Sequence, residues 1–244
     1  MTFRFYTPTP LAELNAEFKL SDDIFHHAVN VLRLRINDEL IVFDGIGHSA
    51  TARLSQVEKK SAHAVLIQTH NVNLESPLNI TLAQCLSVGD KMDWTIEKAV
   101  ELGVQRIVPL FSSKSQIKLS PERAEKKHEH WQRIIVAACT QSGRNVLPII
   151  EAPQSISSYL KQPNDAYKLT LHPHAATALK TLCPPQPNQE IRLLIGPEAG
   201  LDEKEIMTAQ AAGYMTTLLG PRILRTESAG LATIAALQAL WGDF

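Results

Sequence analysis

The chain has 244 residues, of which 44% are hydrophobic and 20% are charged, and its formal net charge at pH 7 is -1. This composition is typical of a globular protein and excludes collagen-like and low-hydrophobicity disordered chains. A net charge near zero argues against a general nucleic-acid coat but is compatible with a local basic face. At about 150 residues per domain, the length allows one large or two small domains.

The chain carries no signal for a membrane or an oxidising compartment. No apolar run approaches the ~20 residues of a transmembrane helix, and the first residues lack the apolar core of a signal peptide. The three cysteines, Cys85, Cys139 and Cys183, are isolated and predict neither a disulfide framework nor a zinc site. We therefore expect a cytoplasmic protein with no membrane partner.

The first part of the chain predicts a β-rich domain with one short helix. Ser21 is the expected N-cap of a helix through Val31. Asp44–Gly47 has the residues of a turn between two strands, as in a hairpin. The predicted strands are Leu40–Phe43, Ser49–Leu54 and Ala62–Ile67. We expect a small barrel over residues 1–73, followed by a linker at Leu74–Pro77.

After Pro77, predicted strands and helices alternate along the chain. The expected strands are Ile80–Leu86, Ile107–Phe111, Leu147–Ile150, Lys168–Leu171, Ile191–Ile195 and Tyr214–Leu219. The expected helices are Lys91–Leu102, Glu122–Gln141, one from the Asp202-to-Glu205 capping box to Ala212, and Glu227–Trp241. This order predicts an α/β domain over residues 76–244, with a mostly parallel sheet and helices on both faces.

Two of these strands lead into segments that contain Gly-Pro. They are Leu194–Gly200 and Leu218–Glu227. Proline ends a strand ladder because it lacks the N–H group, so the backbone there is free to surround a ligand. We expect the two loops to lie at adjacent strand ends and to form a cofactor pocket at the carboxyl edge of the sheet. The alternative is two ordinary strand-to-helix turns. The two arginines and the glutamate of the second loop favour a ligand-binding site over this alternative.

The sequence motifs of several common enzyme sites are absent. It has no Gly-x-Gly-x-x-Gly fingerprint, no P-loop and no Gly-x-Ser-x-Gly elbow. His172 and His174 are spaced to bind a metal but have no obvious partner ligands, so we expect them near the pocket instead. Lys91, Arg106 and Arg144 are either surface residues or contacts for an anionic partner. A pure RNA-binding module and a nicotinamide-dependent oxidoreductase remain as alternatives; the missing glycine fingerprint disfavours the second.

Five motifs follow one another along the chain. They are Gly89–Asp93, Glu97–Val104, Gln141–Arg144, Ile195–Glu198 and Leu219–Glu227. With Arg4–Tyr6 and the His27-to-Arg33 segment, they resemble the RsmE family of bacterial ribosomal RNA methyltransferases over nearly the whole chain. The resemblance implies a PUA-like RNA-binding barrel followed by a SPOUT-class domain, in which a parallel sheet carries a trefoil knot. It also implies a homodimer that acts on 16S rRNA within the small ribosomal subunit.

The implied reaction transfers a methyl group from S-adenosylmethionine (SAM) to N3 of a specific uridine, without a metal. Such a reaction needs in-line positioning and stabilisation of charge on the uracil oxygens. A planar arginine fork suits this task, so Arg225 is our first candidate and Arg222 the second. Glu227 or Glu198 either accepts the N3 proton or fixes a loop, and the loop-fixing role is preferred for Glu198.

The resemblance also implies the binding residues. The expected SAM-binding residues are Leu171, His172, Ile195, Gly196, Pro197, Glu198, Gly200, Leu219, Gly220, Pro221, Ile223 and Leu224. The expected RNA-binding residues are Arg4, Arg33, Arg35, Lys91 and Arg144. Ala199 stands where the family usually has glycine, and its methyl group would crowd the loop if φ there were positive.

Overall fold

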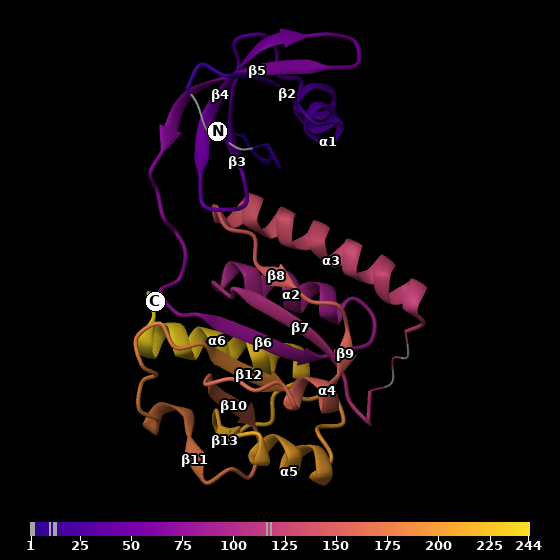
Figure 1. Cartoon of the computed structure of the whole chain (residues 1–244), viewed down its shortest axis with the longest axis vertical. Coiled ribbons are helices and arrows are strands. Elements are labelled where there is room, and N and C mark those ends of the chain that lie inside the picture. Colours follow the sequence, from indigo (N-terminus) through magenta and orange to yellow (C-terminus); the bar gives the residue numbers. More distant parts are fainter. Residues whose placement is uncertain (1–2, 10, 12–13, 116, 118) are drawn as a thin grey trace. The chain divides into compact units, whose positions relative to one another are not determined.

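The structure, a computed structural model, describes residues 3–9, 11, 14–115, 117 and 119–244. The chain divides into two compact units (Figure 1). The first comprises Met1–Glu75 and Cys139–Leu147, and the second comprises Ser76–Ala138 and Pro148–Phe244. No helix in these described ranges is both long enough and apolar enough to cross a membrane.

The first unit is built on a five-stranded sheet in the order β1-β3-β4-β5-β2. Its strands are β1 (Phe3–Tyr6), β2 (Glu17–Lys19), β3 (Glu39–Phe43), β4 (Ser49–Val57) and β5 (Ala62–His70). The predicted hairpin is confirmed: β3 and β4 pair antiparallel from Phe43 opposite Ser49. The intervening Asp44 accepts hydrogen bonds at Oδ1 from the N–H groups of Ile46 and His48, which fixes the turn. Strands β1 and β2 were not predicted.

The helix predicted from Ser21 to Val31 begins as expected but changes its winding. Ser21 Oγ accepts a hydrogen bond from the Ile24 N–H and caps α1 (Asp22–Phe25). The second half, η1 (His26–Val31), is a π-helix, so the helix extends to Val31 as predicted but is not α-helical throughout. Its wider turn is closed by the hydrogen bond from the Leu32 N–H to the His27 carbonyl, at 2.9 Å. Such a turn takes one residue more than an α-helical turn.

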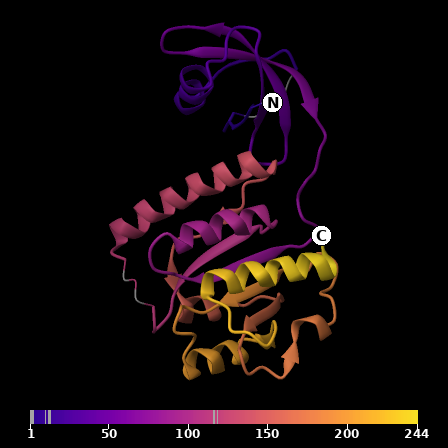
Figure 2. The same ribbon diagram turned by 180° about the vertical axis from the view of Figure 1, so that it is seen from behind.

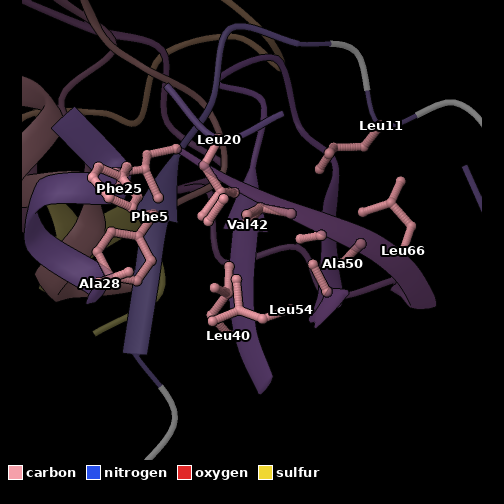
Figure 3. Packing of buried hydrophobic residues seen from close by; sticks show 14 residues of the cluster. Phe5, Leu11, Leu20, Phe25, Ala28, Leu40, Val42, Ala50, Leu54 and Leu66 are labelled. Atoms are coloured by element: carbon pink, nitrogen blue, oxygen red, sulfur yellow. The ribbon is translucent and has the colours of Figure 1, made fainter. Parts of the chain in front are cut away.

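The core of this unit lies between the sheet and the helix (Figure 3). Along β3, Leu40 and Val42 are fully buried, in step with the two-residue period of a strand. Phe25 and Ala28 from the helical segment complete the core, together with Phe5 of β1. In β4, where small or polar residues alternate with apolar ones, the apolar side chains of Ala50, Ala52 and Leu54 are buried.

The second unit contains an eight-stranded sheet in which every described pairing is parallel. The order is β11-β13-β10-β12-β6-β7-β8, with β9 also paired to β7. The strands are β6 (Ile80–Cys85), β7 (Arg106–Phe111), β8 (Ile149–Ile150), β9 (Gln154–Ser155), β10 (Tyr167–Leu171), β11 (Thr177–Ala178), β12 (Ile191–Ile195) and β13 (Met215–Leu218). The predicted parallel α/β sheet is confirmed, and its strand order is compatible with the expected knot.

Helices cover both faces of this sheet, as predicted (Figures 1 and 2). They are α2 (Lys91–Glu101), α3 (Pro121–Ser142), α4 (Ile156–Leu160), the 3-10 helix η2 (Leu179–Thr181), α5 (Glu203–Ala211) and α6 (Thr226–Trp241). α4 and α5 pack on the face to which β6 presents Ala83 and Cys85. α6 packs on the opposite face, where Gly230 lies against Leu82 and Gln84.

Local signals set the ends of these helices. Asp202 caps α5 in a complete capping box with Glu205, as the sequence predicts. Gly103 follows α2 with φ of +87°, a conformation that side chains disfavour. The short elements α4, β9 and β11 were not predicted, because segments of two to five residues carry little periodicity.

One topological expectation is wrong. The strands that precede the two Gly-Pro loops, β12 and β13, are not neighbours; β10 lies between them and pairs with both. Because all three strands are parallel, their carboxyl ends still meet at one edge of the sheet. The residues that follow β10 are therefore brought between the two loops.

Candidate active site

A cavity of about 760 Å³ opens at this edge of the sheet. It is formed by the segments that follow β10, β12 and β13, together with the first turns of α2 and α6. The cavity lining includes every residue predicted to bind SAM: Leu171, His172, Ile195, Gly196, Pro197, Glu198, Gly200, Leu219, Gly220, Pro221, Ile223 and Leu224. The three residues predicted to act in catalysis, Arg222, Arg225 and Glu227, also line it.

Backbone geometry explains the glycines of both loops. Gly200 has φ of +70°, and a Cβ atom on Gly220 would have no neighbouring atom within 4 Å. Ala199 does not adopt a positive φ, so its methyl group causes no backbone strain and the predicted crowding does not occur. Gly196 is tightly packed, because a Cβ there would lie 3.0 Å from Leu201. A half-open cavity of this volume with glycine-lined walls fits a ligand of the size of SAM.

Three charged side chains meet at one side of the cavity. Lys91 Nζ lies 3.5 Å from Glu227 Oε1 and 3.7 Å from Glu198 Oε1. Glu198 Oε1 also accepts a hydrogen bond of 3.2 Å from the Val88 N–H. Glu198 therefore links the first Gly-Pro loop to the segment before α2, as its predicted structural role requires. Lys91, expected to contact RNA, lies in the cavity beside both carboxylates.

The two arginines of the second loop are exposed toward the cavity. Among the described residues, neither the Arg222 nor the Arg225 guanidinium has an ion-pair or hydrogen-bond partner. Arg225 is the N-cap residue of α6, but its side chain makes no capping bond. Although Glu227 is close to Arg225 in the sequence, its carboxylate faces Lys91 and does not orient the Arg225 side chain. Both guanidinium groups are thus available to a ligand.

Sequence reasoning missed part of the lining. Pro173, Thr217, Leu218, Thr226 and Ala229 also line the cavity. His174 lines it too, as expected from the sequence. The rings of His172 and His174 lie 5.8 Å apart, and His172 Nδ1 accepts a hydrogen bond from the His174 N–H. In the described part of the chain, no three possible metal ligands come together there or elsewhere. Of the lining residues that were missed, Thr226 had a signal in the sequence, since it lies within the long Leu219–Glu227 motif.

Two of the predicted RNA-binding arginines are held inside the first unit. Arg144 is buried and pairs with Glu75, with Nη2 at 2.6 Å and Nε at 2.9 Å from Oε2. Arg4 donates to the Arg144 carbonyl at 2.6 Å and stacks over Phe43, with its Cζ 4.2 Å from the ring centre. Burial lowers the pKa of the Arg4 guanidinium, and the negative charge of Glu75 opposes this shift only in part. These contacts favour a structural role for both arginines.

The other two predicted RNA-binding residues of this unit lie on its surface. Arg33 and Arg35 are exposed, directly after the π-helix. Arg33 has φ of +60°, an unusual conformation for a residue with a side chain. The backbone N–H of Arg35 donates to Asp38 Oδ2 at 2.7 Å, so this hydrogen bond does not use the Arg35 guanidinium. Backbone strain of this kind is often retained at functional sites.

Comparison with known proteins gives matches to both units. The family model described as an RNA methyltransferase domain matches residues 74–238. The family model described as an RNA methyltransferase PUA domain matches residues 20–67. Together these matches cover most of the chain and bear out a PUA-like domain followed by a methyltransferase domain.

Individual proteins are similar over nearly their full length. The Ribosomal RNA small subunit methyltransferase E of Buchnera aphidicola is 35% identical, over 95% of this chain and 91% of its own length. The crystal structure of the enzyme of that name from Neisseria gonorrhoeae, bound to SAM, has a TM-score of 0.93 and 43% identity, and the match covers 100% of both chains. The structure of Lpg2936 from Legionella pneumophila, in complex with SAM, has a TM-score of 0.94 and 34% identity, again over 100% of both chains.

Proposed function

This chain belongs to the ribosomal RNA small subunit methyltransferase E family, and on that premise we propose that it transfers a methyl group from SAM to N3 of a uridine in 16S rRNA. The observation that carries the proposal is the cavity at the carboxyl ends of β10, β12 and β13, with two unpaired arginines among the described residues of its lining. SAM, when bound, supplies a methyl group activated by its sulfonium. The chain's own residues must bind the base and remove its proton.

The glycine-containing loops are proposed to hold SAM. The absence of side chains at Gly200 and Gly220 lets the ligand approach the main chain, whose N–H and C=O groups are suited to read an adenine edge. Leu171, Leu219 and Leu224 supply apolar lining. Such a mixture of apolar walls and few polar groups is typical of small-molecule sites.

Arg225, with Arg222 in support, is proposed to bind the uracil oxygens. Loss of the N3 proton leaves negative charge on the ring, and O2 and O4 carry most of it. A guanidinium fork donates hydrogen bonds to such oxygens and stabilises that charge as it develops. Both side chains are exposed, so no existing ion pair has to break before the base enters.

Glu227 is the proposed acceptor of the N3 proton, and Glu198 is not. Glu198 already accepts the Val88 N–H and links two loops. Glu227 lies in the first turn of α6, beside Arg225, and its Oε2 has no hydrogen-bond partner in the described structure. Lys91, whose Nζ lies 3.5 Å from Oε1, holds the carboxylate at the cavity.

The first unit is proposed to bind the RNA around the target, with residues 1–73 as the RNA-binding domain and 76–244 as the methyltransferase domain. Arg33 and Arg35 are the proposed phosphate contacts, because they are exposed. Arg4 and Arg144 are proposed to support this unit from within. The substrate is 16S rRNA within the small ribosomal subunit, as the names of the relatives suggest.

The working unit is proposed to be a homodimer with α6 near the interface. Most of the apolar side chains of α6, including Leu231, Ile234 and Leu237, are buried within the single chain. Leu240 remains 43% exposed and is the apolar contact this helix can offer to a second copy. Light scattering at micromolar concentration should give twice the mass of the chain; a single-chain mass would contradict the dimer.

The activity is tested directly with small ribosomal subunits from a strain that lacks the gene. The purified protein should restore 3-methyluridine, detected by nucleoside mass spectrometry, only when SAM is present. Calorimetry should show one SAM site per chain. Methylation at another atom of uridine, or at another base, would contradict the proposed target while leaving the methyltransferase assignment intact.

A further inference from the structure

A chain of buried polar groups runs beneath the cavity. Gln84, at the end of β6, is fully buried, and its Nε2 donates a hydrogen bond of 3.0 Å to Thr226 Oγ1. The Thr226 hydroxyl in turn donates to the Gly196 carbonyl at 2.5 Å. These three residues come from distant parts of the sequence and belong to β6, the first Gly-Pro loop and the first turn of α6.

The direction of these hydrogen bonds is fixed by the groups around Gln84. Its Nε2 also lies 3.2 Å from the Cys85 carbonyl, which can only accept, so the amide must present its NH₂ group on this side. The Thr226 oxygen therefore accepts from Gln84, and its hydrogen is left for Gly196. Gly230 makes room for Gln84, because a Cβ there would lie 3.2 Å from Gln84 Oε1.

The position of Thr226 places these buried hydrogen bonds beside the proposed catalytic residues. Thr226 stands between Arg225 and Glu227, the proposed uracil-binding and proton-accepting residues, and it is itself 6% exposed. Its partner Gly196 begins the loop that lines the other side of the cavity. One hydroxyl thus joins the loop proposed to hold SAM to the turn that carries the proposed catalytic residues.

We propose that Thr226 is a positioning residue, oriented by Gln84, that holds the Gly196–Gly200 loop against the start of α6 before any ligand binds. The effect on catalysis rests on the proposed function, whereas the ordering of the loop is independent of it. Without the hydroxyl, the Gly196 carbonyl loses its buried donor and the loop samples other conformations. The fraction of molecules competent to bind SAM then falls, and the apparent affinity falls with it.

Substitution of Thr226 by valine and by serine separates the hydroxyl from the shape of the side chain. Valine keeps the volume and removes the donor, whereas serine keeps the hydroxyl. We expect T226V to raise the SAM dissociation constant about 10-fold, from the cost of an unsatisfied buried acceptor. T226S should restore most of the affinity. Equal losses in the two variants would overturn the proposal.

A matched control is available at Thr170. This threonine of β10 is also buried and also donates to a main-chain carbonyl, that of Leu194, at 3.0 Å, but it does not line the cavity. T170V should lower the melting temperature by an amount similar to T226V and leave the SAM dissociation constant near the wild-type value. If both variants weaken SAM binding equally, the effect is general destabilisation and the positioning role is wrong.

Hydrogen exchange of the free protein tests the loop without SAM or RNA. The Gly200 amide is bonded to the Pro197 carbonyl within the loop, and its exchange should accelerate in T226V but not in T226S or T170V. This result is expected even if the wild-type protein fails to bind SAM, which would refute the proposed function alone. Unchanged exchange in T226V would refute the positioning role alone.

The part of Gln84 is tested by Gln84→Met, which keeps the length of the side chain and removes its donor. The same exchange and affinity measurements apply if T226V does not fold. In the double variant Q84M/T226V, the losses in SAM affinity should be smaller than the product of the single losses, because both act on one chain of hydrogen bonds. Independent, multiplicative losses would show that Gln84 does not act through Thr226.

Discussion

Replacement of Arg225 by alanine separates the proposed catalytic role from a structural one. The Arg225 side chain is exposed and has no ion-pair or hydrogen-bond partner in the described structure, so no native contact is lost. Its removal should change the free energy of unfolding by no more than about 0.5 kcal/mol, as for other exposed positions. Any large effect must therefore arise when the substrate is bound.

The expected effect is on the transition state. Loss of one donor to a developing oxyanion costs about 2.7–4 kcal/mol, which corresponds to roughly a 100- to 1,000-fold lower rate of methyl transfer. SAM affinity should change much less, because main-chain groups of the loops make most of the proposed cofactor contacts. Arg225→Lys should restore the rate only in part, since an ammonium cannot hold two oxygens in one plane.

The assay is single-turnover methylation of small ribosomal subunits, combined with calorimetric titration of SAM. Arg133→Ala serves as the matched control, because Arg133 is an exposed arginine of α3 that does not line the cavity. A parallel fall in SAM affinity and rate for Arg225→Ala would show that the side chain supports the loop. That outcome would remove Arg225 from the catalytic residues.

Three further predictions concern the first unit and the thiols. Arg33→Ala should weaken RNA binding and reduce the slope of log affinity against log salt by about one unit, whereas an unchanged slope excludes a phosphate contact. Glu75→Ala should lower the free energy of unfolding in urea by about 3 kcal/mol, because the buried Arg144 guanidinium loses its carboxylate partner; a loss near zero would contradict a stabilising role of this ion pair. Burial raises the pKa of the Cys139 thiol to about 12, so at pH 8 a thiol reagent should modify the exposed Cys183 and spare Cys139 until the protein unfolds. Rapid labelling of Cys139 in the native protein would show that its burial is wrong.

The amino-acid sequence alone determined the features that depend on neighbouring residues. The capping box at Asp202, the glycine that ends α2 and the alternation in β4 are local, since each depends on contacts within a few residues. The Gly-Pro loops were predicted for the same reason, because proline acts on its own backbone and that of its neighbours. These signals were sufficient to predict the parallel α/β domain and a cavity at its Gly-Pro loops, whereas the individual SAM-binding residues were implied by the family resemblance.

The tertiary structure alone decided which distant residues meet. Nothing local indicates that β10 lies between β12 and β13, or that Glu227 faces Lys91 instead of its neighbour Arg225. The same holds for the Thr226 hydroxyl, whose partners Gln84 and Gly196 lie far away in the sequence. Strand order and side-chain pairing depend on how whole elements bury their apolar faces against one another, and that choice is made by the packed chain rather than by any short segment of it.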